Sequence, residues 1–470
     1  MGDVAFSGAV AWARSGLTTR VLTLLAALVV GVAVQGGYES RPRLVVVLAV
    51  VAAAVLTDWS GGWTRTDTLV SAPAAVVLLW LGLSARYGDA DVALGYAATL
   101  IACVAGLLVV RRFSSDEVRA LLHGTVLLGS VVALAGLGGA VLHVEPLAFA
   151  AEGWWRSAAG FTYANATGCF LAACATVALA LLADHPNNAW VAAPGVVLLG
   201  GTAATLSRGA AIALVVGMVV LLLLRGAASV LAWGPVLVGG STLAVTCGLS
   251  WRAASEPRPL LAAAGLGLAM LVTTLLVRRP PSSRAWWAAS VVAVVAGAVL
   301  VARVPELSTR VTLGTPRWSA WAAGLESVRA HVLTGTGPGR LSVTWQEAGA
   351  ARGTTLLHNE YLQVAAELGL VALVLLLVWL GCVLVAMRPG LHRGAPSSYA
   401  AGLAGALGIL VASAGDFFWH ITVLPVLAAL LSGAALAACR SAEPAVIDDG
   451  IARADGAPAP SVVFQGGEVS

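Results

Sequence analysis

Residues 370–387 read LVALVLLLVWLGCVLVAM and contain no charged side chain. An uninterrupted apolar run of this length predicts a transmembrane helix, because about 20 apolar residues cross the hydrocarbon core of a bilayer. Similar runs fill most of the chain on both sides of it. They predict spans at about 17–36, 43–58, 68–84, 91–110, 119–142, 161–183, 189–205, 209–224, 229–250, 260–277, 285–303, 359–386, 399–415 and 419–438. The expected fold is an all-α membrane bundle of about fourteen helices, within a range of 12–14.

The composition of the 470 residues agrees with this fold class. Hydrophobic residues make up 59% of the chain and charged residues only 11%, whereas soluble proteins carry about 25% charged residues. These proportions exclude a soluble enzyme, a disordered chain and a nucleic-acid-binding protein. All 27 basic residues are arginines. Together with the abundance of Ala, Val and Gly, this usage suggests a bacterium with a GC-rich genome.

The sequence predicts no disulfide, no metal site and no cofactor. The six cysteines lie within or at the ends of apolar runs, where Cys behaves as a small apolar side chain. No C-x-x-C or Cys/His ligand spacing is present, and the seven histidines are scattered. The first apolar run, Leu17 to Gln35, is long enough to span and is followed directly by further spans. We therefore interpret it as the first helix and not as a cleaved signal peptide.

Arginines in short loops predict the orientation in the membrane. Fourteen fall on the side of the N-terminus and seven on the other, so the positive-inside rule places both termini in the cytoplasm. The longest hydrophilic loop, 304–357, then lies outside, and the polar tail is expected to be disordered. The predicted parts are N-terminal helices over 1–150, a core over 151–440 that includes this loop, and a cytoplasmic tail over 441–470.

The loop 304–357 carries more arginines than acidic residues although it is predicted to lie outside. Its arginines are Arg310, Arg317, Arg329, Arg340 and Arg352. An anionic ligand at the outer membrane face would explain them. Apolar residues recur at helical spacing from Trp318 to Val328 and predict an amphipathic helix at the interface. The segment Gly335–Gly339 predicts a turn that ends this helix.

Four segments place polar side chains at the ends of apolar runs. They are Ser207-Arg208-Gly209, Arg317 with Trp321 and the Gly335–Gly339 turn, His358-Asn359-Glu360-Tyr361-Leu362 with Glu367, and Gly415-Asp416-Phe417-Phe418-Trp419-His420. In this order, and with the long loop among them, they resemble the O-antigen ligase and Wzy-type polymerase superfamily. The segment Phe161–Ala166 is similar to the family's aromatic-Pro-Asn segment, with Ala164 where Pro is common. His331-Val332 likewise departs from a frequent His-Pro.

The resemblance covers about residues 155–435 and implies an integral membrane glycosyltransferase. Such an enzyme transfers a glycan from a polyprenyl-diphosphate carrier to an acceptor hydroxyl without metal or nucleotide sugar. It would act at the extracytoplasmic face of the bacterial plasma membrane. The expected partners are the lipid-linked glycan donor, a glycan or lipid acceptor and membrane lipids, with no nucleic acid.

The resemblance and the chemistry of the transfer predict roles for the site residues. Arg208 and Arg317 bind the diphosphate, because a guanidinium stays charged and contacts phosphate oxygens with two donors. His358 activates the acceptor hydroxyl as a general base, and Glu360 and Glu367 are the competing bases. Further residues expected to contact the substrate are Asn165, Asn359 and Tyr361, and Asp416 and Arg310 are additional candidates. Direct attack would invert the anomeric centre, because no second carboxylate is placed for a covalent intermediate.

Each of these residues also has a purely structural interpretation. Arg208 could cap a helical hairpin and reach lipid headgroups, and His358-Asn359 could act only as an N-cap. Asp416 is interpreted as a helix cap or a hydrogen-bonding group within the bundle, with a role in the site as the alternative. Gly335–Gly339 is better explained by a tight turn than by a phosphate nest. We favour the functional interpretation for the arginines and His358, because they occur together in the family order.

Three other functions remain open on the sequence. Asp89-Ala90-Asp91 matches a D-x-D motif of metal-dependent glycosyltransferases that use polyprenyl-monophosphate donors, although Asp before a helix is a natural N-cap. A transporter or flippase of lipid-linked glycans would need polar groups at mid-span, which are rare here. A peptidoglycan polymerase of the shape-and-division type would need a catalytic Asp in the loop 304–357, which has none. Polymerase and ligase are not separated by these residues, because only the acceptor differs between them.

Overall fold

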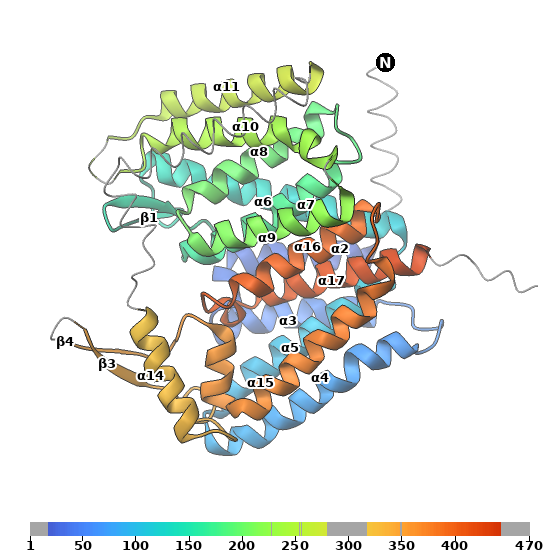
Figure 1. Cartoon of the computed structure of the whole chain (residues 1–470), viewed down its shortest axis with the longest axis vertical. Helices are drawn as coiled ribbons and strands as arrows, with labels where there is room; N and C mark the ends of the chain where they lie inside the picture. The colour runs from blue at the N-terminus through green and yellow to red at the C-terminus, as the bar shows by residue number, and fades with distance from the viewer. Residues whose placement is uncertain are drawn as a thin grey trace, which may run out of the picture.

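The computed structural model describes residues 17–226, 228–252, 254, 256–279, 317–347 and 350–442. Over these residues the chain forms a bundle of long helices with two small antiparallel hairpins (Figure 1). The predicted span 285–303 and the candidate Arg310 lie outside the described residues.

The helices coincide with the predicted spans to within four residues at each described end. The first six are α2 (Thr19–Ala33), α3 (Ser40–Val55), α4 (Arg65–Ser84), α5 (Ala90–Arg111), α6 (Ser115–Leu142) and α7 (Ala164–Leu182). Those that follow in the bundle are α8 (Ala189–Ala204), α9 (Arg208–Arg225), α10 (Ala228–Gly248), α11 (Pro259–Arg278), α15 (Glu360–Met387), α16 (Ser397–Ala412) and α17 (Val423–Ala442).

The length and apolar composition of the helices confirm that the chain is a multi-pass membrane protein. Within the described ranges, nine helices are long and apolar enough to cross a membrane, and α2, α8 and α16 are shorter apolar helices. The total of fourteen spans stays a prediction, because one of them falls outside these ranges. The division of the chain at residues 150 and 440 also stays a prediction.

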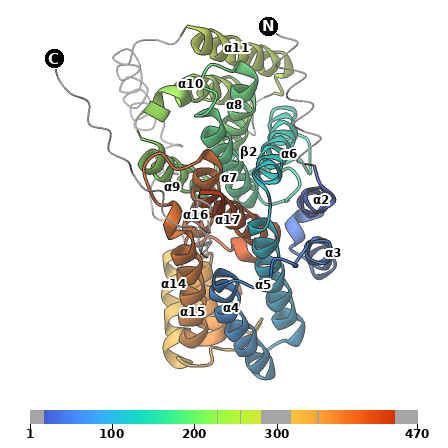
Figure 2. The same cartoon turned by 90° about the vertical axis from the view of Figure 1, so that its right-hand side faces the viewer.

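Helix α7 lies in the middle of the bundle (Figure 2). Over the stretch of α7 that is long enough to cross a membrane, 94% of the residues are buried inside the protein. The helix is rich in Ala, Gly, Cys and Thr, and such small side chains let neighbouring helices approach closely within a membrane. Tyr163 and Asn165, at its N-terminal end, are therefore attached to the most firmly packed helix of the molecule.

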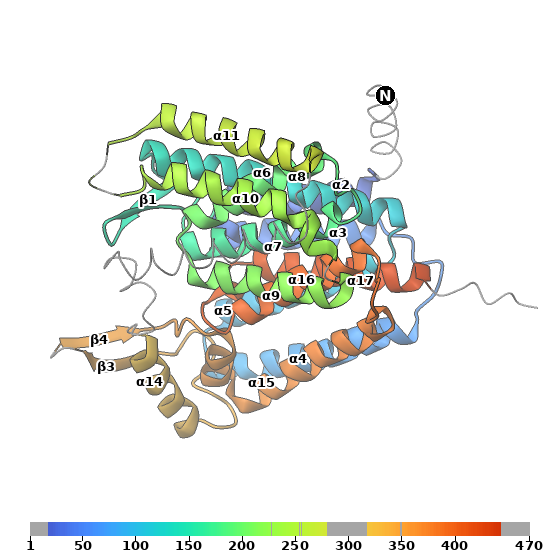
Figure 3. The same ribbon diagram turned by 45° about the horizontal axis from the view of Figure 1, so that its top comes forward.

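The described part of the 304–357 loop folds against the start of α15. It comprises α14 (Arg317–Ala330), β3 (Val343–Glu347) and β4 (Ala350–Thr354). Leu341, Val343 and Leu357 are buried together with Val328 of α14 in a small core of their own. The predicted helix is confirmed, but Trp318 and Leu325 of its predicted apolar face are exposed, and its position at the membrane interface stays a prediction. The hairpin was not predicted, because its strands are only five residues long. In Figures 1 and 3 this hairpin and β1 project from the same side of the bundle.

The turn Gly335–Gly339 packs against a break in α15. Gly369 has φ 81° and ψ 169° there, which interrupts the helical hydrogen bonds and leaves carbonyls of the preceding turn available. The amides of Thr336 and Gly337 donate to the carbonyls of Ala366 and Glu367, both at 2.9 Å. These amides are therefore already used within the protein. The tight-turn interpretation of this segment is confirmed.

Candidate active site

The segment between α16 and α17 brings a buried carboxylate to the start of α7 and the start of α15. Asp416 lies in this connection and is only 2% exposed. Its oxygens accept hydrogen bonds from the Tyr163 hydroxyl at 2.8 and 2.9 Å and from Asn165 Nδ2 at 2.7 Å. Its own neighbour, the Phe417 amide, donates to Oδ1 at 3.0 Å. Asp416 does not cap α17, which begins at Val423.

His358 forms a dyad with this carboxylate. Its Nδ1 lies 2.9 Å from Asp416 Oδ1. Because an ionised carboxylate can only accept, Nδ1 must carry the hydrogen, and Nε2 of the neutral imidazole keeps its lone pair. The His358 side chain is 33% exposed, so solvent or a substrate can reach the ring. Its backbone φ of +52° lies in the left-handed region, which few non-glycine residues adopt.

Arg317 reaches the same carboxylate from the loop. It is the first residue of α14, and its guanidinium donates to the Gly415 carbonyl and to Asp416 Oδ2 at 3.4 Å. The helix is anchored next to the dyad, because Trp321 Nε1 donates to the Leu357 carbonyl at 2.7 Å. The Arg317 side chain is 28% exposed. The His358 imidazole and the Arg317 guanidinium thus both contact the buried Asp416 carboxylate.

The charges around Asp416 keep it ionised. Burial raises the pKa of this carboxyl, but the hydrogen bond from His358 and the charge of Arg317 outweigh burial, and the pKa falls below its ordinary value. Burial and the neighbouring Asp416 charge both raise the pKa of Tyr163, so its hydroxyl stays protonated and donates. Asp416 is therefore a charged acceptor at neutral pH.

Arg156 links this cluster to the turn that carries Arg208. The residue lies on β2 (Trp154–Ser157), which pairs with β1 (Ala148–Ala151). Its guanidinium donates to Asn165 Oδ1 at 2.7 Å and to the Thr205 carbonyl at 2.9 Å. Arg208 follows Thr205 closely as the exposed first residue of α9, after the N-cap Ser207. The turn before Arg208 is therefore linked to the Asp416 cluster through Arg156 and Asn165.

A second polar cluster lies on the other side of Phe417. The Phe417 ring centre is 4.9 Å from that of His358 and 6.4 Å from that of His420. Glu360 Oε1 accepts from the Trp419 amide and from His420 Nδ1, the latter at 3.1 Å. Burial lowers the pKa of His420, but the Glu360 carboxylate outweighs burial and the pKa rises above its ordinary value. Glu360 is thus engaged with His420 and not with His358.

Three further predicted residues, Asn359, Tyr361 and Glu367, form hydrogen bonds within the protein. Asn359 is the N-cap of α15 and accepts from the Leu362 amide at 3.0 Å, which confirms the capping interpretation for this residue. The Tyr361 hydroxyl donates to the Leu410 carbonyl at 2.9 Å. Glu367 accepts from the Tyr96 hydroxyl at 2.9 Å, deeper along α15. Their roles toward a substrate stay predictions.

Sequence reasoning brought the predicted site residues forward but missed four residues that form hydrogen bonds with them. These are Tyr96, Arg156, Tyr163 and His420. Tyr163 had a signal, since it stands two residues before Asn165. Arg156 and Tyr96 had none, because nothing in their local sequence reports the helices that they contact.

The D-x-D segment acts as a helix cap. Asp89 is the N-cap of α5, and its side chain accepts from the amides of Asp91 and Val92 at 2.8 and 3.2 Å. The part of the chain that the structure describes contains no group of three His, Cys, Asp or Glu residues placed to hold a metal ion.

Comparison with known families finds a match over a part of the chain that includes two of these residues. A sequence model described as O-antigen ligase matches residues 258–377. The match includes Arg317 and His358 and confirms the predicted family resemblance. No curated protein matches the chain.

Proposed function

We propose that this chain, in which residues 258–377 match the O-antigen ligase family, is a membrane glycosyltransferase. It moves a glycan from a polyprenyl-diphosphate carrier to an acceptor hydroxyl. One observation carries the proposal: Asp416 accepts a hydrogen bond from His358 and also pairs with Arg317. A base for the acceptor and a cation for the leaving group are held side by side on one carboxylate.

His358 is the general base of the proposed step. Its Nε2 takes the proton of the acceptor hydroxyl while that oxygen forms a bond to the anomeric carbon. The bond from this carbon to the diphosphate oxygen breaks, and its electron pair leaves with the polyprenyl diphosphate. The imidazolium is stabilised by Asp416 and later releases the proton to water.

Arg317 and Arg208 stabilise the charge that develops on the diphosphate. Guanidinium groups suit this task because they stay charged and donate two hydrogen bonds to phosphate oxygens. Arg208 stands at the N-terminus of α9, where the helix dipole also favours an anion. With these cations in place, the proposed transfer needs no metal ion.

The transfer is proposed to invert the anomeric centre. A retaining enzyme would need a carboxylate free to attack the sugar. Asp416 is buried, and its oxygens are occupied by Tyr163, Asn165, His358 and Arg317. Direct attack by the acceptor remains, and this inverts the configuration.

The site is proposed to face the outside of a bacterial plasma membrane. The orientation rests on the arginine distribution of the short loops. Whether the enzyme elongates a polysaccharide or ligates it to another molecule depends on the acceptor. The chemistry of the site is the same for both.

The test is a reconstitution of the purified full-length protein in liposomes with polyprenyl-diphosphate oligosaccharide and excess chelator. The readouts are the transferred glycan and the released polyprenyl diphosphate. We expect His358→Ala to lower the rate about 10²–10⁴-fold and Arg317→Ala about 10²–10³-fold.

Matched controls come from the same loop. His331→Ala and Arg329→Ala remove an exposed histidine and an exposed arginine that do not contact Asp416, and both should retain activity. Activity that survives His358→Ala and Arg317→Ala, or that requires metal, would contradict the proposal.

A further inference from the structure

Four polar side chains outside the dyad form a continuous chain of hydrogen bonds. Glu360 Oε1 of α15 lies 3.1 Å from His420 Nδ1 of the α16–α17 connection, and His420 Nε2 lies 3.0 Å from the Tyr96 hydroxyl of α5. The same hydroxyl lies 2.9 Å from Glu367 Oε2, deeper along α15. We call Glu360, His420, Tyr96 and Glu367 the inner network.

The contacts of Tyr96 require one more proton than two carboxylates and a neutral imidazole contain. The hydroxyl has a single hydrogen, which serves either Glu367 or His420. With both glutamates ionised and the ring neutral, Nδ1 carries the ring hydrogen toward Glu360 and Nε2 keeps a lone pair. The Tyr96 oxygen would then face another lone pair at 2.9 or 3.0 Å, on whichever side lacks the hydrogen. One further proton removes this repulsion.

The hydrogen bonds of Glu367 favour His420 as the site of this proton. Glu367 Oε1 accepts from Gln363 Nε2 at 2.7 Å, and Oε2 accepts from the Gly339 amide at 3.2 Å. The Tyr96 hydroxyl is a third donor to the same carboxylate. Hydrogen bonds to a carboxylate favour its ionised form. The proton then resides on His420, which donates from both ring nitrogens.

The charges around His420 balance when its ring is an imidazolium. Burial lowers the pKa of His420, but the Glu360 and Glu367 carboxylates outweigh burial and raise it above its ordinary value. The guanidinium of Arg43, near the start of α3, acts on the ring in the opposite direction. Arg43 approaches over Gly95, where a Cβ would lie 1.8 Å from Nη1. Two carboxylates, one guanidinium and one imidazolium sum to zero charge.

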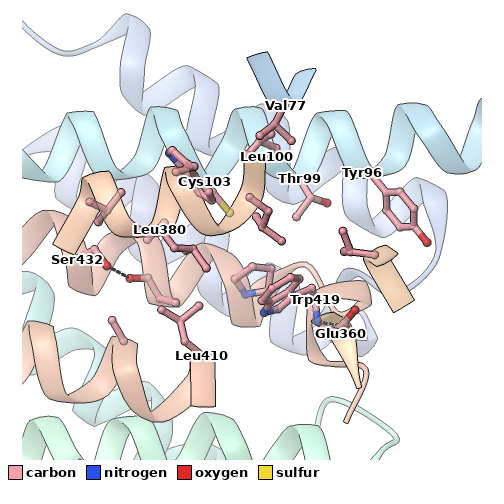
Figure 4. Close-up of a pocket in the computed structure, with 18 of the residues that line it drawn as sticks. Val77, Tyr96, Thr99, Leu100, Cys103, Glu360, Leu380, Leu410, Trp419 and Ser432 are labelled. Atoms are coloured by element: carbon pink, nitrogen blue, oxygen red, sulfur yellow. Dashed lines mark hydrogen bonds between the residues drawn. The ribbon is translucent and has the colours of Figure 1, made fainter. Parts of the chain in front are cut away.

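The inner network lies at the polar end of a mostly apolar cavity between α4, α5, α15, α16 and α17 (Figure 4). Tyr96, Glu360 and Trp419 are at this end in Figure 4, whereas Leu380 and Ser432 are at the other. Most of the remaining lining is Leu, Val, Ala and Met. Such surroundings give little solvation to a net charge, so the electrically neutral arrangement is the favoured one.

One end of the inner network holds the segment that carries Asp416. Glu360 Oε1 accepts from the backbone amides of Trp419 and His420 as well as from the His420 ring. Both residues follow Asp416 within the α16–α17 connection. The position of the dyad carboxylate therefore depends on Glu360 and on the ring that pairs with it.

The other end of the inner network holds the loop that carries Arg317. Glu367 accepts from the amide of Gly339, in the turn that follows α14, and Arg317 is the first residue of α14. If His420 loses its proton, the Tyr96 oxygen faces a lone pair, and its contact with either Glu367 or His420 opens. Each outcome shifts a segment that holds one member of the proposed site.

We propose that His420 is a positioning residue that acts as an imidazolium, and that Tyr96 extends its hydrogen bond to Glu367. The imidazolium joins the segment of Asp416 to the loop of Arg317 in the arrangement that the transfer needs. This inference rests on the proposed transferase function and adds a residue that does not touch the substrate. The protonated ring stabilises the arrangement, so its contribution is complete at low pH and is lost as the pH rises through the raised pKa of His420.

The first test follows the charge of the ring by solid-state NMR of the full-length protein, labelled with ¹⁵N-histidine, in liposomes. The His420 signal is assigned by its loss in His420→Gln. It should become neutral at a higher pH than a histidine of ordinary pKa, which is about 6.5. Glu367→Gln supplies a covalent hydrogen in place of the proton, so the same ring should become neutral about one pH unit lower than in wild type. This readout needs no turnover.

The second test is the pH–rate profile of the liposome reaction. Wild type should lose activity on the alkaline side as His420 becomes neutral. His420→Gln and Tyr96→Phe should lower kcat at neutral pH by up to about 10²-fold, as misplaced reacting groups do. Glu367→Gln should retain activity within about tenfold and lose the alkaline limb. A purely structural role would lower the rate equally at every pH.

The matched control is His331→Gln, which changes an exposed loop histidine and should keep the alkaline limb and the His420 titration. If His420→Gln fails to fold, Tyr96→Phe identifies the signal by its shift.

A His420 ring that titrates at or below the ordinary pKa, or an alkaline limb unchanged in Glu367→Gln, overturns the inference. A raised titration in a wild-type protein that transfers no glycan would overturn the proposed function and leave the imidazolium in place.

Discussion

At the scale of single residues, Asp416 organises the site. It collects Tyr163, Asn165, His358 and Arg317 around one buried carboxylate. A carboxylate in this position orients the imidazole and stabilises the imidazolium that forms during proton transfer. The pair His358–Asp416 is therefore the unit that mutagenesis should address.

Asp416→Asn should lower the transfer rate about 10²–10⁴-fold. The amide retains the size of the side chain but removes the charge that stabilises the imidazolium. The rate of the liposome reaction measures the effect. A variant with near wild-type activity would show that His358 acts without this partner.

The same substitution has a pH-dependent effect on stability. The pKa of Asp416 is lower in the folded protein than its ordinary value, which is about 3.9 in an unfolded chain. The charged form therefore stabilises the fold above pH 4 or so, and this contribution is lost as the pH falls through the lower native pKa. The melting temperature of wild type should exceed that of Asp416→Asn at pH 5–8, and the two should converge as the pH falls below about 4. A constant difference down to pH 3 would contradict the assignment.

Tyr163→Phe tests a residue that sequence reasoning had passed over. The change removes a hydroxyl that donates to Asp416, which should cost about 1–3 kcal/mol of stability at this buried acceptor. We expect a lower melting temperature and a reduced rate, with the KM for the donor little changed. A large rise in the KM for the donor would instead indicate that Tyr163 contacts the donor.

At the scale of elements, the break in α15 holds the loop that carries α14 in place. Carbonyls next to Gly369 accept from the Gly335–Gly339 turn, and the Pro338 carbonyl accepts from the Asp89 amide at 2.7 Å. The turn thereby joins α15 to the start of α5. Because α14 lies just before this turn, the same contacts determine where Arg317 is positioned.

Gly337→Ala should displace the loop while the bundle remains folded. Gly337 has φ +97°, and a Cβ there would collide with the Tyr87 backbone. Hydrogen exchange should increase over residues 331–347, and transfer activity should fall about tenfold or more. Gly353→Ala in β4 is the control, since a Cβ there meets only ordinary contacts of 3.4 Å. Unchanged exchange in Gly337→Ala would show that the turn tolerates a side chain.

At the scale of the whole molecule, the loop elements lie on one side of the bundle. The hairpin β1–β2, the hairpin β3–β4 and α14, whose first residue is Arg317, lie on the same side (Figures 1 and 3). Ion pairs such as Glu117 with Arg20 lie near the other ends of the helices. Which of these two ends faces the cytoplasm stays a prediction from the arginine distribution.

Cysteine accessibility tests that orientation. Gly353→Cys in the exposed hairpin should react with a membrane-impermeant maleimide on intact cells. His392→Cys, exposed between α15 and α16, should react only after permeabilisation. The reverse pattern would place the site in the cytoplasm and refute the predicted orientation.

Most helix positions could be predicted from the sequence, because each membrane-spanning helix needs its own continuous run of apolar residues. A run of about 20 apolar residues reports a span wherever it occurs, and the described helices begin and end within four residues of the predicted positions. The hairpins were missed, because strands of four or five residues leave no distinct period. Arg317 and His358 were put forward because they stand in motifs that resemble those of the family, and their roles stay predictions.

The sequence by itself determined the membrane class, the helical bundle and the identity of the proposed base and cations. Only the tertiary structure decided that Asp416 joins them, because the partners of this carboxylate lie 58 to 253 residues away along the chain. The packing of α7, α15 and the α16–α17 connection brings these distant groups together. No local pattern encodes such a contact, since it depends on how whole helices pack against one another.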